Sequence, residues 1–399
     1  MGSPAAPALA ERREQAERLA GDLELPSFKG RPGWEFTDIS GLELDAYRPA
    51  AAGSAAAPSA RLFDLESPAS LPEGVVVSTI DEAAQAHPDL IERHLGAIVQ
   101  PGDLFAARNA ARFQGGAFVY VPRGVAVEEP IVLTSVQSED GSELDRRTLI
   151  VLEEGAQAEV WEQYLSGEEE LDGVFNLVTE LVVGDNARLR YVSGQSLSEK
   201  TWIFGAQRAE VGRDGYLDWV ALGFGSARGR VRMETKLAGE GAEARVTGAY
   251  ASRGRQHIDF DTTQEHAAPN TTSDLAFRGV LTGRSTAVWK GNIIVDPGAQ
   301  KTDAFQESRN LLLSKRAHAD AIPGLEIQAN DVRCTHAAAV AQVDPEQLFY
   351  LRSHGLDEEV ARRLVVEGFL AALVERFEAG PVRERLAAAL ERRLAAVLG

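Results

Sequence analysis

The chain lacks several of the residues on which common kinds of function depend. Its 399 residues include one cysteine, Cys334, and 2 methionines. A lone thiol cannot form an intrachain disulfide, a four-cysteine zinc site or the four-thiolate cage of an iron–sulfur cluster. So few methionines also exclude the Met-rich surface of a promiscuous hydrophobic binder. Any metal or sulfur chemistry therefore needs ligands from another chain.

Basic residues and long apolar runs are also scarce. The chain has 41 Lys and Arg against 60 Asp and Glu, which gives a formal net charge of −19. An acidic surface repels phosphate backbones and anionic lipids, so neither nucleic acid nor membrane is expected as the main partner. No apolar run approaches the roughly 18 residues of a transmembrane helix, and the first apolar stretch is too short for a signal peptide. We expect a soluble, cytoplasmic protein.

The usual catalytic motifs are missing. No Walker A loop, HExxH or GxSxG stands in the sequence. The glycines at 223, 225 and 229 resemble a dinucleotide-binding fingerprint. That fingerprint requires a helix N-terminus directly after it, whereas the residues that follow here are predicted to form a strand. We expect no enzymatic activity from this chain itself.

The first part of the chain, residues 1–110, is predicted to be a helical region. A helix is expected over residues 7–20, and a second over residues 81–98 with Asp81 as its N-cap. Residues 49–58 are nearly all Ala, Gly, Ser and Pro, which indicates a mobile linker.

Residues 111–343 have a different sequence pattern. Short apolar runs end in glycine-centred turns, and no helical periodicity occurs between them. The first glycines of these turns, Gly155, Gly184, Gly212 and Gly239, recur every 27 to 29 residues, and Gly298 follows after about two further intervals. Such a period without helices is typical of a β-solenoid, in which each coil buries its inner face on the next. An ordinary β-sandwich with long hairpins is the alternative, and the repeated turn type favours the solenoid.

Residues 344–399 are predicted to be a C-terminal helical domain. Asp344 precedes a proline and is followed by Gln347, which is the pattern of a capped helix start. Two longer helices are expected after Gly355, with a break at Gly380.

Two polar clusters could carry chemistry. His257 and Asp259 share one face of a predicted strand, and His266 follows. Imidazole and carboxylate groups are suitable ligands for iron or zinc. A solvated polar face also explains the alternation, and we favour that interpretation. Cys334 and His336 also have the same parity, about 7 Å apart on one strand face. They are either soft and borderline metal ligands or a buried cysteine beside a hydrogen-bonded histidine.

Several linked motifs closely resemble the SufB/SufD family of iron–sulfur cluster assembly proteins. They are residues 257–273 (HIDFDTTQEHAAPNTTS), 298–306 (GAQKTDAFQ), 310–314 (NLLLS), 325–336 (LEIQANDVRCTH) and 346–356 (EQLFYLRSHGL). Within that family the chain is similar to SufD-type members, because residues 34–38 (WEFTD) and the Cys-x-His of 334–336 match their pattern.

The resemblance implies a mostly β fold, a right-handed parallel β-helix flanked by N-terminal and C-terminal helical regions, which agrees with the repeat. It also implies a non-enzymatic scaffold subunit of a complex with SufB and the ATPase SufC. An iron–sulfur cluster would be assembled transiently at the SufB–SufD interface, and this chain alone would hold no cofactor and no stable metal. An isolated chain could form a homodimer.

The same resemblance implies roles for individual residues. His336 and Cys334 would lie at the cluster-assembly interface, and the helices after Asp344 would dock the ATPase. The expected docking residues are Leu348, Phe349, Tyr350, Leu351, Arg352 and Gly355. Two positions depart from the family pattern: residues 337–341 (AAAVA) replace a glycine-containing run, and His354 replaces the usual arginine. The alternatives are a SufB-type role, disfavoured by the single cysteine, and a carbohydrate-active β-helix protein, disfavoured by the missing signal peptide.

Overall fold

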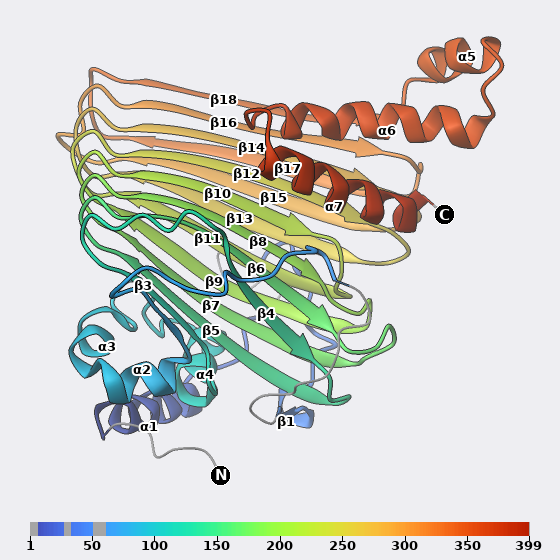
Figure 1. The fold of residues 1–399 in the computed structure, drawn as a ribbon. Helices are drawn as coiled ribbons and strands as arrows, with labels where there is room; N and C mark the ends of the chain where they lie inside the picture. The colour runs from blue at the N-terminus through green and yellow to red at the C-terminus, as the bar shows by residue number, and fades with distance from the viewer. Residues whose placement is uncertain (1–6, 28–32, 51–60, 399) are drawn as a thin grey trace.

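The predicted solenoid is the central feature of the fold. The computed structural model describes residues 7–27, 33–50 and 61–398. It shows a parallel β-solenoid with helices packed at both ends of the chain (Figure 1). Most of the linker predicted over 49–58 lies outside the described residues.

The solenoid consists of two sheets that are parallel throughout the described residues, except for one short antiparallel strand at the N-terminal end of the first sheet, Val76–Ser78. In the described residues the first sheet contains, in spatial order, β17 (His318–Ile327), β15 (Thr286–Val295), β13 (His257–His266), β11 (Arg228–Leu237), β9 (Thr201–Val211), β7 (Gly173–Val183), β5 (Ser142–Leu152), β3 (Ala117–Val121) and β2 (Val76–Ser78), with β1 (Arg48–Pro49) beside β5. The second contains β18 (Arg333–Gln342), β16 (Asp303–Leu312), β14 (Thr272–Leu281), β12 (Glu243–Ser252), β10 (Tyr216–Gly223), β8 (Arg188–Ser196), β6 (Gln157–Ser166) and β4 (Ile131–Gln137). Along the solenoid each strand pairs with the strand two places later, so one coil is one strand from each sheet.

The repeated turns form one edge of the solenoid, where the chain crosses from the first sheet to the second. Gly155 has φ +70, and Asn186 and Asp214 occupy the same left-handed region at the next two turns. These residue types adopt a positive φ most readily. The turn repeat seen in the sequence is therefore a repeat of backbone geometry.

Alternate side chains of each strand fill the space between the two sheets, called the lumen here. Val160, Tyr191, Trp219, Val246 and Leu275 occupy equivalent positions in successive strands of the second sheet and are all buried in one core cluster. Stacking of equivalent side chains from coil to coil makes the lumen one continuous core.

The N-terminal region differs from its prediction at one helix. It contains α1 (Pro7–Asp22), the 3₁₀ helix η1 (Leu44–Ala46), α2 (Ile80–Ala86), α3 (Pro88–His94) and α4 (Leu104–Arg112). The single helix expected over 81–98 is wrong, because Pro88 lacks the N–H that would continue α2 and instead starts α3. Its N-cap is also not Asp81 but Thr79, which forms a capping box with Glu82.

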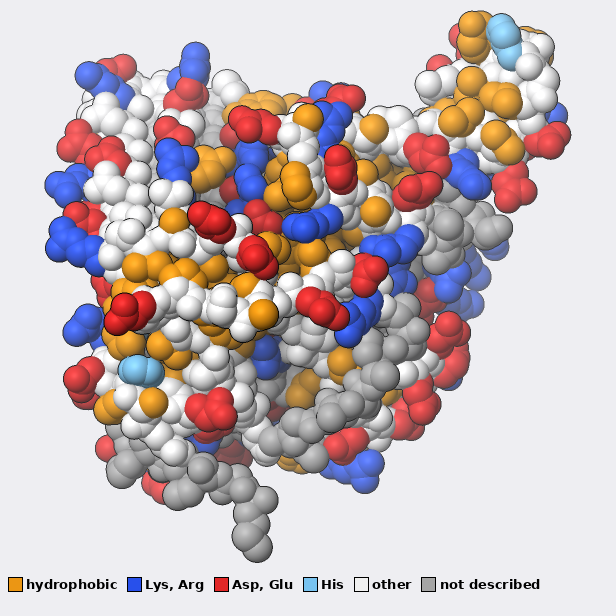
Figure 2. Space-filling model, viewed as in Figure 1, with side chains coloured by type: hydrophobic (Ala, Val, Ile, Leu, Met, Phe, Trp, Pro, Cys, Tyr) orange, Lys and Arg blue, Asp and Glu red, His pale blue; other side chains and the backbone are white. Residues whose placement is uncertain are grey.

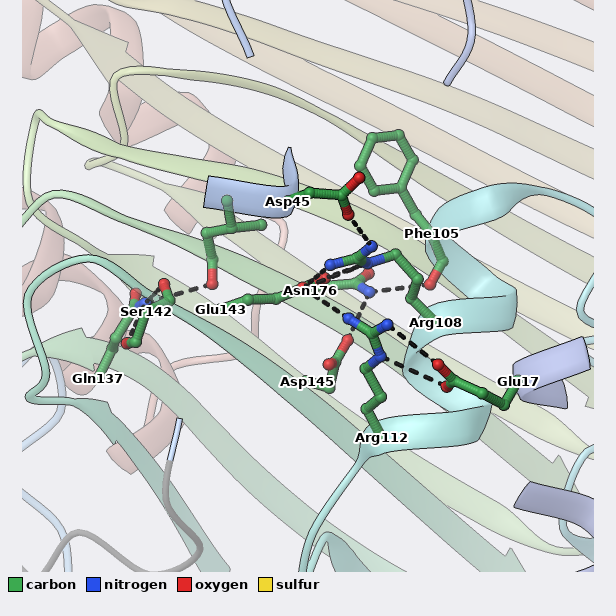
Figure 3. Close-up of polar contacts among 11 residues, drawn as sticks. Glu17, Asp45, Phe105, Arg108, Arg112, Gln137, Ser142, Glu143, Asp145 and Asn176 are labelled. Atoms are coloured by element: carbon green, nitrogen blue, oxygen red, sulfur yellow. Dashed lines mark hydrogen bonds and ion pairs between the residues drawn. The ribbon is translucent and has the colours of Figure 1, made fainter. Parts of the chain in front are cut away.

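Buried ion pairs fasten this region to the first coils (Figure 3). The Arg108 guanidinium of α4 donates to Glu143 of β5, with Nε 3.0 Å from Oε1, and also to Asp45 at 2.9 Å. Asn176 of β7 donates to the Asp145 carboxyl at 2.7 Å and to the Phe105 carbonyl at 2.8 Å. Burial, and then the nearby Glu143, raises the pKa of Asp145 to about 8, so this carboxyl is largely protonated at neutral pH.

The C-terminal helices are α5 (Pro345–Ser353), α6 (Glu358–Val374) and α7 (Pro381–Leu398), close to their predicted bounds. Val366, Leu370 and Phe377 of α6 and the residues after it join the core cluster on the outer face of the second sheet. Arg245 and Arg278 of that sheet donate to the carbonyls of Arg376 and Phe369. The α6–α7 pair is therefore a fixed part of the solenoid wall, whereas α5 has no buried residue and projects away from it (Figure 1). No helix among the described residues combines the length and apolar character that crossing a bilayer requires.

Candidate functional site

The solenoid ends in an open coil formed by β17 and β18, called the terminal coil here. Each of these strands is the last of its sheet in the part of the chain that the structure describes. Each therefore presents a row of backbone N–H and C=O groups without a strand partner, which is a template for pairing with another chain.

Cys334 and His336 both lie on β18 with the inward-facing parity. Residues at equivalent positions in successive strands of one sheet form a column here. Backbone register places His336 next to Gln306 of β16, in the same column as the buried Leu275, and places Cys334 next to Ala304. The Cys334 side chain packs against the small core cluster that contains Ala304 and Val295. The predicted shared face is thus present, and it is the face that looks along the open lumen.

Inward-facing apolar side chains of the terminal coil are left exposed. Leu325 and Ile327 of β17 continue columns whose preceding members, Ile293 and Val295, are fully buried. Yet Leu325 is 36% exposed, Ile327 42% and Val340 of β18 43%. In any earlier coil these positions would be covered by the next coil, so the end of the lumen is an apolar surface that surrounds Cys334 and His336.

The coil beneath this surface is polar where the earlier coils are apolar. Gln306 and Ser308 of β16 are buried at positions that Leu275 and Phe277 occupy one coil earlier, and the buried Asn310 follows on the same face. The Gln306 amide spans the lumen and donates to the carbonyls of two glycines on β15 and β17, Gly291 at 3.2 Å and Gly324 at 3.1 Å. A polar layer thus lies directly under the inward face of β18.

The thiol at this site is protonated in the isolated chain. Burial, and then the nearby Asp303 carboxylate, raises the pKa of the Cys334 thiol above its ordinary value. A thiolate is the form that binds metal, so Cys334 is a weak ligand unless a metal ion or another positive charge nearby lowers the pKa of its thiol.

The structure does not bring His257, Asp259 and His266 together. His257 and Asp259 share the outer face of β13, whereas His266 has the opposite parity and lies at the other end of the strand. Among the described residues, no three His, Cys, Asp or Glu side chains gather closely enough to hold a metal ion. The favoured interpretation as a solvated face is also wrong for the first two, since residues 34–38 cover them and leave His257 7% and Asp259 4% exposed.

His266 is held by two hydroxyl groups. Its Nδ1 is 2.8 Å from Thr271 Oγ1 and its Nε2 is 2.9 Å from Ser273 Oγ. Thr271 Oγ1 also lies 3.1 Å from the Ala268 carbonyl, which can only accept; with Thr271 donating there, Nδ1 carries the imidazole proton and Nε2 accepts from Ser273. Burial lowers the pKa of His266 to about 4.

This buried imidazole makes stability fall in acid. Because the folded pKa lies below the ordinary value near 6.5, the contribution is complete above pH 6.5 and is lost as the pH falls towards 4. The loss amounts to about 3 kcal/mol at most. Between pH 7 and 4.5, the unfolding free energy of the wild type is expected to fall by about 2 kcal/mol more than that of the His266→Asn variant. The measurement is urea denaturation at each pH. The exposed His354→Asn variant is the control, and an equal loss in all three proteins would contradict the assignment.

The predicted docking residues lie on or just after α5. Asp344 caps this helix by accepting from the Glu346 N–H, as the sequence predicted. Phe349 and Tyr350 are 73% and 62% exposed. Figure 2 shows hydrophobic side chains on the projecting end of the molecule where Figure 1 draws α5. Leu348 and Leu351 are half-buried, Arg352 pairs with Glu358 at 3.5 Å, and Gly355 ends the segment with φ +89. These two neighbouring aromatic side chains form an exposed hydrophobic patch, and contiguous patches are the kind of surface on which proteins bind partners.

Sequence reasoning missed two residues that make key contacts around the candidate sites. Thr37, within the WEFTD element, contacts both His257 and Asp259, and Gln306 forms the cross-lumen bridge. Both residues belong to motifs that the sequence analysis singled out, but only the three-dimensional pairing of distant segments identifies their partners.

Comparison with known proteins agrees with these features. Residues 135–369 match the family described as "SUF system FeS cluster assembly, SufBD core domain", and residues 61–133 match "SufBD protein N-terminal region". The iron–sulfur cluster assembly protein SufD of Bacillus subtilis is 35% identical over 327 residues, covering 81% of this chain and 74% of that protein. An iron–sulfur cluster assembly SufBD family protein of Mycobacterium tuberculosis is 32% identical over 84% of this chain and 86% of its own length.

A SufBD family protein of Synechocystis is more distant, at 28% identity over 74% of this chain and 64% of that protein. The matched core domain covers β5 to α6, and therefore the whole terminal coil with Cys334 and His336. The chain belongs to the SufBD family of iron–sulfur cluster assembly proteins, and its similarity to SufD agrees with the motif pattern of its sequence.

Proposed function

We propose that this chain is a non-enzymatic SufD-type scaffold subunit that joins SufB through its terminal coil, with a nascent iron–sulfur cluster assembled at the junction. The open end of the solenoid is the observation that supports this role. Two adjoining strand edges and the exposed apolar side chains of β17 and β18 form one continuous surface. The end of another β-solenoid would cover the apolar side chains and pair with the strand edges.

The ligands on this surface fit a shared site rather than a complete one. Cys334 and His336 supply one sulfur and one imidazole, whereas a cluster bound by protein needs about four ligands. The partner would supply the remaining thiolates. The cluster is the cargo of this site, and this chain contributes His336 as an interfacial ligand or proton acceptor and Cys334 as a supporting thiol.

The SufC ATPase is proposed to dock on α5. Phe349 and Tyr350 are the exposed aromatic anchors, and Leu348, Leu351, Arg352 and Gly355 complete the surface. Because α6 is packed on the solenoid wall while α5 projects from it, force applied at α5 would reach the terminal coil through β18 and the connection at 343–344. In the absence of SufB, the same strand edges would pair with those of a second copy.

The proposed interface is tested by placing a charge on it. We expect Val340→Asp to reduce recovery of SufB with this chain at least tenfold in co-purification, because a carboxylate would be buried without a partner. Val360→Asp is the matched control, since Val360 is 44% exposed on α6, away from the terminal coil, and Val340 is 43% exposed.

A second matched pair guards against misfolding as the explanation. Leu325 on the terminal coil and Leu19 on α1 are each 36% exposed, so Leu325→Asp and Leu19→Asp cost similar local packing. If both terminal-coil variants still retained SufB at the wild-type level, the junction would lie elsewhere on the molecule. A SufB-type role for this chain would instead be supported by a cluster that remains bound to it alone.

A further inference from the structure

Residues 34–38 cross the outer face of the first sheet, and we call this segment the strap. Trp34 stacks on Phe105 of α4 with ring centroids 5.6 Å apart, and it contacts Phe204 of β9 at 6.1 Å. The Arg230 guanidinium of β11 lies over the Trp34 ring at 5.1 Å. Thr37 then reaches β13, so the strap spans three strands that follow it by more than 160 residues.

A chain of polar contacts joins the strap to the sheet. The Thr37 hydroxyl, which is fully buried, contacts the Asp259 carboxyl oxygen Oδ2 and lies 3.1 Å from Nε2 of His257. The other ring nitrogen of His257, Nδ1, is 2.7 Å from Thr286 Oγ1 on β15. Four side chains thus form one line that runs from the buried Asp259 to the half-buried Thr286.

The number of protons in this line limits its arrangements. Thr37 has one hydroxyl proton and two neighbours that could accept it, so it donates to one and must accept from the other. If Asp259 is protonated, its O–H donates to Thr37, Thr37 donates to Nε2, and Nδ1–H donates to Thr286. If Asp259 is ionised, every bond reverses: Thr286 donates to Nδ1, Nε2–H donates to Thr37, and Thr37 donates to the carboxylate.

We propose that these four side chains form a proton relay in which loss of one proton from the buried Asp259 switches the tautomer of His257 while the strap stays bonded. In the step, the Asp259 proton moves to Thr37, the Thr37 proton to Nε2, and the Nδ1 proton to Thr286. Thr286 releases its own hydroxyl proton to solvent water. The imidazole stays neutral, and both end states satisfy every member of the line.

The surroundings of the relay allow Asp259 to change charge near neutral pH. The charged groups that face it are Arg228 and Arg230 of β11, Asp261 of β13, Lys290 of β15 and Asp38 of the strap. Burial raises the pKa of Asp259 to about 7, against the opposing attraction of Arg230, whose Nε is 3.7 Å from Oδ2. Burial and the nearby Arg228 lower the pKa of His257 to about 4, so the imidazolium form is absent over the same range.

His266 provides an internal comparison on the same strand. It also lies between two hydroxyl groups, but Thr271 donates to a backbone carbonyl and no carboxylate enters its line. With Thr271 donating to that carbonyl, the imidazole proton of His266 is on Nδ1. Two buried neutral histidines of β13 are thus expected to behave differently in one spectrum.

The test is long-range 1H–15N correlation NMR of the full chain labelled with 15N-histidine, recorded from pH 6 to 8. The expected result is that the protonated nitrogen of His257 changes from Nδ1 to Nε2 along a one-proton curve, while His266 keeps its Nδ1 proton throughout. His257→Gln assigns the signal. A His257 that keeps one tautomer over this range, or becomes doubly protonated, would overturn the relay.

A pair of carboxylate variants separates the relay from a general electrostatic effect. Asp259→Asn is expected to abolish the pH dependence of the His257 tautomer. Asp261→Asn, which removes a carboxylate two residues along the same face that does not contact Thr37, is expected to keep the switch and only shift its midpoint. If the wild-type switch survived in Asp259→Asn, another group would be the proton source and the proposal would be wrong.

Discussion

His336→Ala will abolish cluster formation in the co-expressed complex of this chain with SufB and SufC, while the complex itself still assembles. The register of β18 places His336 on the inward face of the terminal coil, among side chains that a partner solenoid would cover. The alanine removes a ligand without emptying a packed core position, because His336 is exposed in the isolated chain. Loss of a ligand or its support typically costs tenfold or more in metal affinity, about 1.4 kcal/mol or above.

The measurement is labile sulfide and cluster absorbance in anaerobically purified complexes. Cys334→Ser is expected to be milder, since the thiol has a raised pKa and is half-buried against Ala304. The isolated chain is expected to retain no stable cluster, because it offers a single thiol.

His318→Ala is a suitable control. The Nε2 atom of His318 lies 3.2 Å from Asp320 Oδ1 on the same face of β17. It serves because β17 turns it outward, opposite in parity to the inward-facing Ala319. A full cluster yield in His336→Ala, or a complex that falls apart, would show that this histidine is structural.

The periodic part of the fold was predictable because it depends on local rules. Turn glycines repeat at a nearly constant interval, and the turns that they mark contain a residue with a positive φ, such as Gly155 in the first and Asn186 in the second. The helix start at Asp344 followed from capping chemistry, which involves neighbours within three residues. Such features can be predicted because the residues that cause them lie within a few positions of one another in the sequence.

The features that the sequence could not provide depend on contacts between distant segments. The burial of His257 and Asp259 is caused by Thr37, about 220 residues earlier, and strand alternation alone reads the same face as solvated. The break at Pro88 was visible in the sequence but was overridden by the apolar pattern on either side. For Cys334 and His336 the parity was predictable, whereas their position on the last, uncovered coil required the order of strands.

Phe349→Ala will weaken binding of the SufC ATPase by a factor of about 30 or more, without changing the stability of this chain. Aromatic anchors of this kind typically contribute 2 kcal/mol or more to an interface. Phe349 is 73% exposed and α5 contains no buried residue, so the isolated protein gains nothing from its side chain. The measurement is calorimetric titration of SufC into the purified chain, with the thermal unfolding midpoint recorded beside it.

Point variants test this docking surface better than a truncation. Truncation after Val343 would remove α6 and α7 together with α5, and α6 and α7 cover Val220, Leu222 and Phe224 on the solenoid wall. If the truncated protein failed to bind SufC, the cause could be the newly exposed core and not the loss of the docking surface.

Phe36→Ala is the matched control for the aromatic variant, because Phe36 is 43% exposed on the strap over the other sheet. Tyr350→Ala is expected to resemble Phe349→Ala, although part of its ring already contacts His354 at 4.4 Å between centroids, so its loss should be smaller. Equal SufC affinity in wild type, Phe349→Ala and Tyr350→Ala would exclude α5 as the docking helix. Binding would then have to involve the solvent-facing side of α6, where Val360 and Leu364 are each 44% exposed.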